Sequence, residues 1–148
     1  MRRQRERGFT LIELLVVMTI IGLLSAAVML ALPDTGGSLR DEAERFAARA
    51  HAARDFAITG SRSVGIDVGP AAYAFQRRRG AEWQALAERP FRQEAWKKGT
   101  AVAFNGRGAG RIVFDSTGLA EPARLTLVRG KRQVTVDVAA DGRIDVAS

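Results

Sequence analysis

The sequence Gly8-Phe9-Thr10-Leu11-Ile12-Glu13 joins a basic leader to a long apolar segment. Four arginines precede it, and no residue from 14 to 32 carries a charge. The segment predicts one helix that is long enough to span a bilayer, for which about 20 apolar residues suffice. A carboxylate in such a segment costs roughly 2.5–3.5 kcal/mol on insertion scales. Glu13 therefore requires a partner or a function.

These residues resemble the class III signal of type IV pilins and type II secretion pseudopilins. The resemblance implies that a prepilin peptidase cleaves between Gly8 and Phe9 on the cytoplasmic side and methylates Phe9, the new N-terminal residue. It also implies that Glu13 pairs with the N-terminal amine of a neighbouring subunit during assembly. A buried carboxylate and a buried ammonium each need the other, because an unpaired charge in an apolar bundle is costly.

Two other interpretations compete with this one. An ordinary secretory signal peptide would have a basic start, an apolar core and a cleavage site near Ser25-Ala26-Ala27. The apolar run is longer than the core of about 7–15 residues in such peptides, and it contains Glu13 near its start. A plain membrane anchor would explain the length of the run but not the glutamate. The multi-residue pattern therefore favours the pilin-like interpretation.

The distribution of charge predicts the topology of the chain. Its 148 residues have a formal net charge of +7. The leader, residues 1–8, holds four arginines and one glutamate, so the mature chain would carry +4. Because basic residues favour the cytoplasmic side, we expect a single-pass inner-membrane protein. Residues 9–32 would form the transmembrane and assembly helix, and the domain that follows would be periplasmic. With no cysteine, that domain must rely on its core.

Residues 33–60 predict a chain break followed by an amphipathic helix. Residues 33–37 contain one proline and two glycines, which interrupt a helix. Ser38 and Asp41 have the spacing of a capping box, and Gly60 has the place of a C-cap glycine. Between these ends, apolar residues recur at helical spacing and predict the buried stripe: Leu39, Ala43, Phe46, Ala50, Ala53 and Ala57. The opposite face carries charged residues: Arg40, Glu44, Arg45, Arg49 and Arg54.

Residues 61–148 predict a β-sheet domain. Apolar and polar residues alternate in short runs that are separated by turn signals such as Asp141-Gly142. We expect strands at residues 64–68, 73–75, 82–86, 101–104, 111–114, 125–128, 133–138 and 143–146. Residues 88–100 and 105–110 have no clear period and are expected to form loops. The fold class is therefore α+β. The resemblance implies a pilin-like form, in which a long N-terminal helix, half in the membrane and half amphipathic, packs on antiparallel sheets.

The later part of the chain resembles the minor pseudopilin H and FimT-like family. The resemblance rests on Ala53-Arg54, on Phe114-Asp115-Ser116-Thr117-Gly118 and on the hairpin around Asp141-Gly142-Arg143. It implies a minor pseudopilin of a type II secretion system, near the tip of the periplasmic pseudopilus that drives exoprotein export. The implied partners are the major pseudopilin, the other minor tip subunits, the prepilin peptidase and the inner-membrane assembly platform. The alternative is a FimT- or FimU-like minor pilin of a type IV pilus, acting in adhesion, motility or DNA uptake.

The sequence predicts no catalytic residue, cofactor or metal site. His51 is the one histidine, and without cysteine it has no obvious companion for a metal site. The segment from Gly106 to Gly110 is rich in glycine but lacks the lysine and hydroxyl of a phosphate-binding loop. Basic groups that could hold phosphates occur at residues 77–79, 97–98 and 129–132. Because basic residues at turns usually form a solvated edge, this patterning does not favour nucleic acid as a partner.

Overall fold

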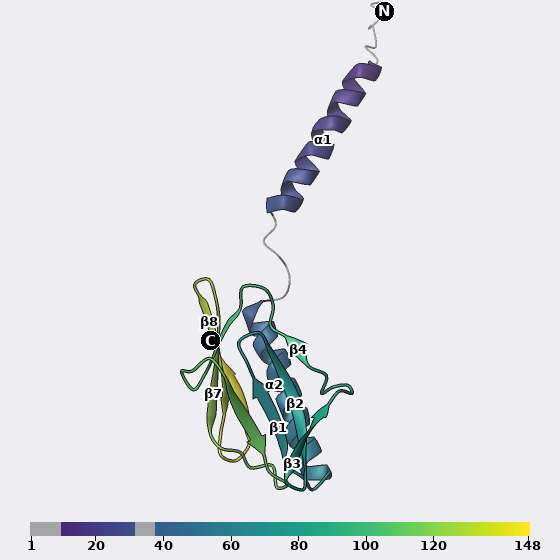
Figure 1. Cartoon of the computed structure of the whole chain (residues 1–148). Helices are drawn as coiled ribbons and strands as arrows, with labels where there is room; N and C mark the ends of the chain where they lie inside the picture. The colour runs from purple at the N-terminus through teal and green to yellow at the C-terminus, as the bar shows by residue number, and fades with distance from the viewer. Residues whose placement is uncertain (1–9, 32–37) are drawn as a thin grey trace, which may run out of the picture. The chain divides into compact units, whose positions relative to one another are not determined.

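The computed structural model describes residues 10–31 and 38–148, which belong to two units. The first unit contains helix α1 (Leu11–Ala31). The second begins with helix α2 (Leu39–Thr59) and continues through all the strands (Figure 1). The cleavage-site residues Gly8 and Phe9 lie outside the described residues, and so does the expected chain break at 33–37.

Helix α1 is apolar around its whole circumference. Its large side chains are exposed on every side, from Val17 at 43% to Leu11 at 83%. An amphipathic helix can bury one apolar stripe and leave its polar face in water. Helix α1 has no polar face, so it needs apolar surroundings on all sides. Within residues 10–31 and 38–148, no helix reaches the combination of length and hydropathy that crossing a membrane requires. The span expected over residues 9–32 extends beyond the described residues at both ends and stays a prediction.

Helix α2 has the bounds that its sequence predicts. Ser38 is the N-cap and forms a complete capping box with Asp41, in which the Ser38 N–H donates to the carboxylate at 2.7 Å. All six residues of the predicted stripe are buried. Gly60 is the C-cap residue, but its φ is −83°, and the left-handed conformation falls on Ser61 instead.

Two antiparallel sheets follow α2. The first has the order β3-β2-β1-β6, with the short β4 also paired to β2, and the second has the order β5-β7-β8-β9. The strands are β1 (Val64–Val68), β2 (Ala72–Arg79), β3 (Glu82–Leu86), β4 (Glu94–Ala95), β5 (Ala101–Phe104), β6 (Gly110–Phe114), β7 (Ala123–Arg129), β8 (Arg132–Val138) and β9 (Ile144–Ala147). Every predicted strand is present, and the α+β, pilin-like fold class is confirmed.

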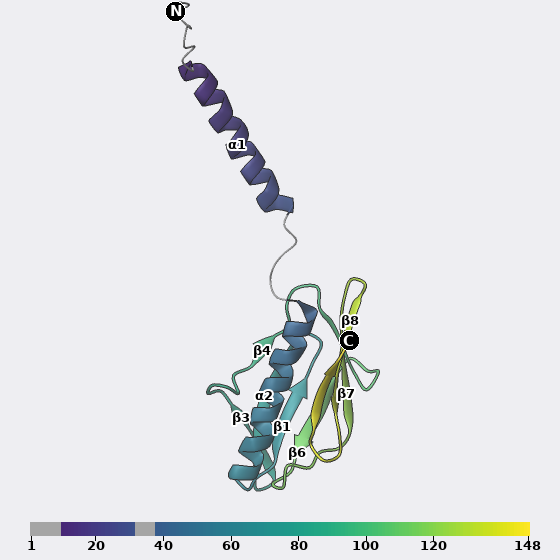
Figure 2. The same ribbon diagram turned by 180° about the vertical axis from the view of Figure 1, so that it is seen from behind.

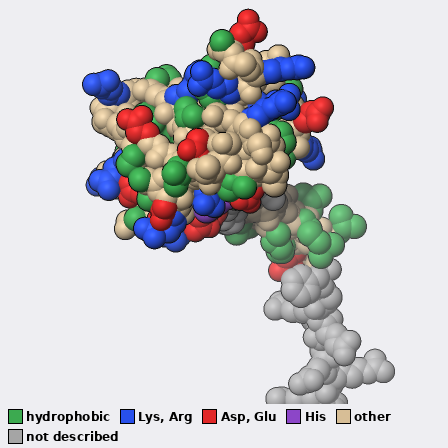
Figure 3. All heavy atoms as spheres, turned by 90° about the horizontal axis from the view of Figure 1, so that it is seen from below, with side chains coloured by type: hydrophobic (Ala, Val, Ile, Leu, Met, Phe, Trp, Pro, Cys, Tyr) green, Lys and Arg blue, Asp and Glu red, His purple; other side chains and the backbone are tan. Residues whose placement is uncertain are grey.

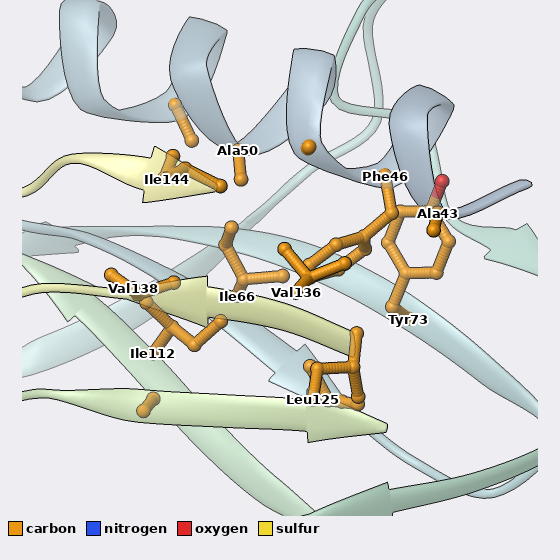
Figure 4. Packing of buried hydrophobic residues seen from close by; sticks show 14 of the residues in the cluster. Ala43, Phe46, Ala50, Ile66, Tyr73, Ile112, Leu125, Val136, Val138 and Ile144 are labelled. Carbon is orange, nitrogen blue, oxygen red and sulfur yellow. The ribbon is translucent and has the colours of Figure 1, made fainter. Parts of the chain in front are cut away.

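The core of the second unit lies between α2 and both sheets. Helix α2 packs against β1 of the first sheet and against β8 and β9 of the second (Figure 2). Phe46, Ile66 and Val136 are buried at this junction (Figure 4). The alanines at 43, 50, 53 and 57 have no side chain beyond Cβ, so the helix can approach the strands closely. The helix and both sheets therefore share one core, which holds the surface of the unit in a fixed arrangement.

One prediction about this unit was wrong. Residues 88–100 are not all loop, because Glu94 and Ala95 form β4 and pair with Tyr73 and Ala72 of β2. Arg49 and Arg54, which the helical pattern places opposite the buried stripe, are covered by segments remote in sequence. The exposed fraction of the Arg49 side chain is only 12%.

Candidate functional site

The first turn of α1 holds the one predicted site residue that the structure describes, Glu13. Its backbone N–H donates to the Thr10 carbonyl at 3.0 Å and to the Thr10 hydroxyl at 3.3 Å. The hydroxyl contact is the one that an N-cap residue makes, so Thr10 starts the helix and fixes Glu13 at its third position. This role of Thr10 was not predicted, although Thr-x-x-Glu is a recognisable capping signal.

The Glu13 carboxylate is placed to receive a cation. It lies in the first helical turn, where the positive end of the helix dipole favours a negative charge. Among residues 10–31 and 38–148, no side chain donates a hydrogen bond to it or pairs with it. Its neighbours Leu11, Ile12 and Leu14 are apolar and exposed. The surface around Glu13 therefore offers one carboxylate in an otherwise apolar environment, which suits a single ammonium or guanidinium from another chain.

A buried ion pair lies near the first turn of α2. Glu42 is 6% exposed and accepts hydrogen bonds from the Lys97 backbone N–H at 2.6 Å and the Thr100 hydroxyl at 2.9 Å. Its carboxylate also pairs with the guanidinium of Arg129, which in turn contacts the Thr100 hydroxyl at 2.7 Å. The group joins α2 to the segment before β5 and to the end of β7. Its saturated hydrogen bonding indicates a structural role.

Arg49 and Arg54 hold loops onto α2. Arg49 donates to the Pro90 carbonyl at 2.7 Å, to the Tyr73 hydroxyl at 3.0 Å and to Glu94 at 2.5 Å. Burial raises the pKa of the Tyr73 hydroxyl, which keeps it neutral. Arg54 donates to the Gly118 carbonyl at 3.1 Å and to the Asp141 carbonyl at 3.3 Å. These arginines therefore fix the surface loops of the unit in place.

Two of the predicted basic groups lie in different sheets. Residues 77–79 lie at the end of β2 in one sheet, and residues 129–132 lie at the β7–β8 turn in the other. Arg129 forms an ion pair with Glu42. On the face seen in Figure 3, Lys and Arg side chains are interspersed with Asp and Glu side chains. That face shows no continuous basic stripe of the kind that nucleic-acid binding would favour.

His51 lies on the surface of α2, and Asp115 lies in the turn after β6. His51 is exposed on α2 and has no described carboxylate partner. The Asp115 carboxylate accepts from the Thr117 hydroxyl at 2.6 Å and from the Leu119 N–H at 3.0 Å, and the Thr117 hydroxyl is the main cause of its lowered pKa. These bonds are those of a turn-forming aspartate. In the part of the chain that the structure describes, no group of three acidic or histidine side chains could hold a metal ion.

Two family models match this chain, one over its N-terminal segment and one over the unit formed by α2 and the strands. Residues 3–29 match the model of the prokaryotic N-terminal methylation motif, and residues 42–142 match that of the type II transport protein GspH. Type II secretion system protein H of Pseudomonas aeruginosa is 30% identical over 96% of this chain and 97% of its own length. The protein of the same name from Aeromonas hydrophila is 36% identical, but the match covers 58% of this chain and 49% of the relative.

Solved structures share the fold at lower identity. The minor pseudopilin EpsH of the Vibrio cholerae type 2 secretion system has a TM-score of 0.66 and 18% identity, over 76% of this chain and 98% of that one. The type IV minor pilin FimU of Pseudomonas aeruginosa has a TM-score of 0.59 and 14% identity, over 74% and 88%. Escherichia coli GspH in solution has a TM-score of 0.60 and 19% identity, over 73% and 86%.

Proposed function

This chain belongs to the type II transport protein GspH family and is a minor pseudopilin of a type II secretion system, and we propose that it works there by polymerising through its N-terminal helix. The observation that carries this proposal is α1. It is apolar on every side, it has one carboxylate in its first turn, and its large side chains are exposed. Packing against the equivalent helices of other subunits would satisfy both properties at once.

The proposed maturation prepares this helix for assembly. A prepilin peptidase cleaves between Gly8 and Phe9 and methylates the Phe9 amine. The match of residues 3–29 to the N-terminal methylation motif supports this step. Thr10 then caps α1 directly after the new N-terminus. Cleavage thus produces a free ammonium only a few residues from Glu13.

The proposed assembly contact joins that ammonium to Glu13 of a neighbouring subunit. Within one chain, Glu13 lies in the first turn of a helix that leads away from the N-terminus. In a bundle of such helices, the carboxylate of one subunit and the ammonium of the next would each lose water. Each therefore needs the other, and the pair fixes the axial register between subunits. Polymerisation rather than catalysis is thus the activity that we assign to the chain.

The proposed location is the inner membrane before assembly. The uncharged sequence of residues 14–32 and the arginines of the leader support a single-pass anchor with a cytoplasmic N-terminus. The α2 and β-sheet unit then lies in the periplasm. There it meets the major pseudopilin and the other minor subunits at the inner-membrane assembly platform. A position near the tip of the pseudopilus follows from the family resemblance.

A type IV pilus is the weaker alternative. The FimU likeness is 14% identical and shows the fold alone, whereas the family model and both curated relatives are type II secretion proteins. Deletion and complementation distinguish the two. We expect the deletion to stop exoprotein secretion, the wild-type gene to restore it, and twitching motility and DNA uptake to be unchanged. Normal secretion with lost pilus function would contradict the proposal.

A further inference from the structure

A cavity of about 450 Å³ lies at the end of the second unit where α2 and β3 end. Phe56 of α2 and Phe91 of the loop after β3 contribute aromatic walls, and their ring centroids are 5.0 Å apart. Leu86 at the end of β3 adds a third apolar side chain. Arg77, Glu88 and Arg89 supply the charged part of the lining. The cavity therefore combines apolar walls with an excess of positive charge.

Arg77 occupies an unusual position for an arginine. Side chains on a strand alternate between faces, so Arg77 shares its face of β2 with the buried residues Tyr73 and Phe75. It thus continues the core-facing row of the strand at the point where the core ends. Its Nε is buried and has no hydrogen-bond partner within the residues that the structure describes. A buried donor without a partner costs free energy, so the position calls for an explanation.

The charge in the cavity is not neutralised by the unit itself. Across residues 10–31 and 38–148, neither Arg77 nor Arg89 forms an ion pair with a carboxylate, and Glu88 of the same lining pairs with neither of them. By contrast, Arg49 and Arg54 on the neighbouring helix satisfy their donors with loop carbonyls. The unused donors of Arg77 therefore distinguish this cavity from the rest of the α2 surface.

We propose that the cavity receives an acidic side chain, flanked by an apolar one, from another pilin-like subunit of the same assembly. This inference rests on the proposed function and identifies a surface through which the chain would contact another subunit. A carboxylate matches the planar donors of an arginine, and the aromatic walls would take the apolar neighbour. The apolar walls disfavour a phosphate backbone, which is charged and hydrated along its whole length, as the occupant. The contact would add a periplasmic interface to the one formed by α1.

Site-specific photo-crosslinking in cells tests the proposal. A photoreactive residue replaces Ala87, an exposed residue of the cavity lining, in the full chain expressed with its complete secretion system. Arg77→Met removes the charge and the unpartnered Nε while keeping most of the volume. Arg78→Met makes the same change on the opposite face of β2 and is the matched control. Arg89→Met, at an exposed loop position, repeats the test without altering the strand.

We expect the adduct to contain a segment with Asp or Glu from another pilin-like subunit, as identified by mass spectrometry. Arg77→Met and Arg89→Met should lower its yield by roughly tenfold or more, and Arg78→Met should leave it unchanged. The unfolding temperature of Arg77→Met should not fall, because the substitution removes a buried donor without a partner. An adduct that survives both cavity substitutions, falls equally in the control, or joins nucleic acid would overturn the proposal. Loss of secretion on deletion, restored by the wild-type chain, is scored separately and tests the proposed function alone.

Discussion

The carboxylate of Glu42 in α2 and the guanidinium of Arg129 at the end of β7 form a buried ion pair that joins the helix to the second sheet. The same carboxylate accepts from the backbone N–H of Lys97 and the hydroxyl of Thr100. One side chain near the start of α2 thus fixes the helix to two segments that follow it by more than 50 residues in sequence. Its loss would leave several donors without an acceptor.

Glu42→Ala should destabilise the second unit strongly. Breaking a buried pair by removing one partner costs about 3–5 kcal/mol, and the partial exposure of Arg129 places the expected loss at the lower end. Glu44→Ala is the matched control, because Glu44 pairs with Arg40 on the exposed face of the same helix and should cost less than about 1 kcal/mol. Urea unfolding of the mature chain in detergent measures both. Equal losses in the two variants would contradict the structural role assigned to the buried pair.

Asp41 should make the stability of the unit depend on acidic pH. The Ser38 backbone N–H bonds its carboxylate and holds the pKa of Asp41 below its usual value of 3.8. A carboxyl whose pKa is lowered by folding stabilises the fold above its unfolded pKa, and this contribution is lost as the pH falls through the folded pKa. Asp41→Asn should therefore flatten the fall in unfolding temperature below about pH 4. If the unfolding temperature of Asp41→Asn falls with pH as steeply as that of the wild type, Asp41 makes no such contribution to stability.

Gly142 should tolerate no side chain. Its φ is +76°, and a Cβ built there would lie 2.0 Å from the Gly118 carbonyl oxygen and 2.5 Å from Nε of Arg54. The added methyl would therefore force apart the two loops that Arg54 holds. Gly130→Ala is the control, because its φ is +60° and a Cβ there meets nothing within 4 Å. We expect Gly130→Ala to lower the free energy of unfolding by about 1–2 kcal/mol through backbone strain alone. Gly142→Ala should lower it by roughly 1–3 kcal/mol more, because of the clash. Similar unfolding midpoints for the two variants would contradict the clash.

Local signals in the sequence predicted most of the fold. The capping box at Ser38 and Asp41 and the glycine at 60 defined both ends of α2, and the alternation of apolar residues identified strands as short as β5. Each of these features depends on residues that lie close together in the chain. The same reasoning selected Glu13 as a candidate assembly residue, because a carboxylate in an apolar segment stands out without any knowledge of tertiary structure; its role stays a prediction.

Contacts between distant segments were beyond that reasoning. The helical period placed Arg49 opposite the buried stripe, but it could not show that Pro90, 41 residues later in the chain, would accept its hydrogen bond. The pairing of β4 with β2 was missed for a similar reason, because two residues carry no detectable alternation. The cavity around Arg77 also depends on α2, β2 and β3 meeting at one place. Such features become visible only when the fold brings separate elements together.

The N-terminal signal predicts one maturation product. Membranes from cells that express the prepilin peptidase should yield a chain that has lost residues 1–8 and carries one additional methyl group on Phe9. Intact mass spectrometry measures both changes. Replacing Gly8 with a bulky residue should leave the full-length precursor, because the peptidase needs close access to the bond. A mature chain that begins at Ala27 or Val28 would indicate signal peptidase and would contradict the pilin-like maturation.

The substitution Glu13→Ala separates folding from assembly. Glu13 lies in the first unit, which does not include the core around α2, so the second unit should unfold as in the wild type. Removing the carboxylate should also ease insertion of the isolated subunit into lipid. In the polymer, however, the amine of a neighbour would lose its counter-charge, at a cost on the order of 3–5 kcal/mol. Glu13→Asp keeps the charge with a shorter reach and should retain part of the function.

Co-purification of the Glu13→Ala chain with the other pseudopilins, measured beside exoprotein secretion in the same cells, tests polymerisation through α1 most directly. The polymerisation mechanism predicts a processed, stable subunit that no longer co-purifies with the other subunits and that supports little secretion. A variant that co-purifies and supports secretion at wild-type levels would contradict the assembly role of Glu13.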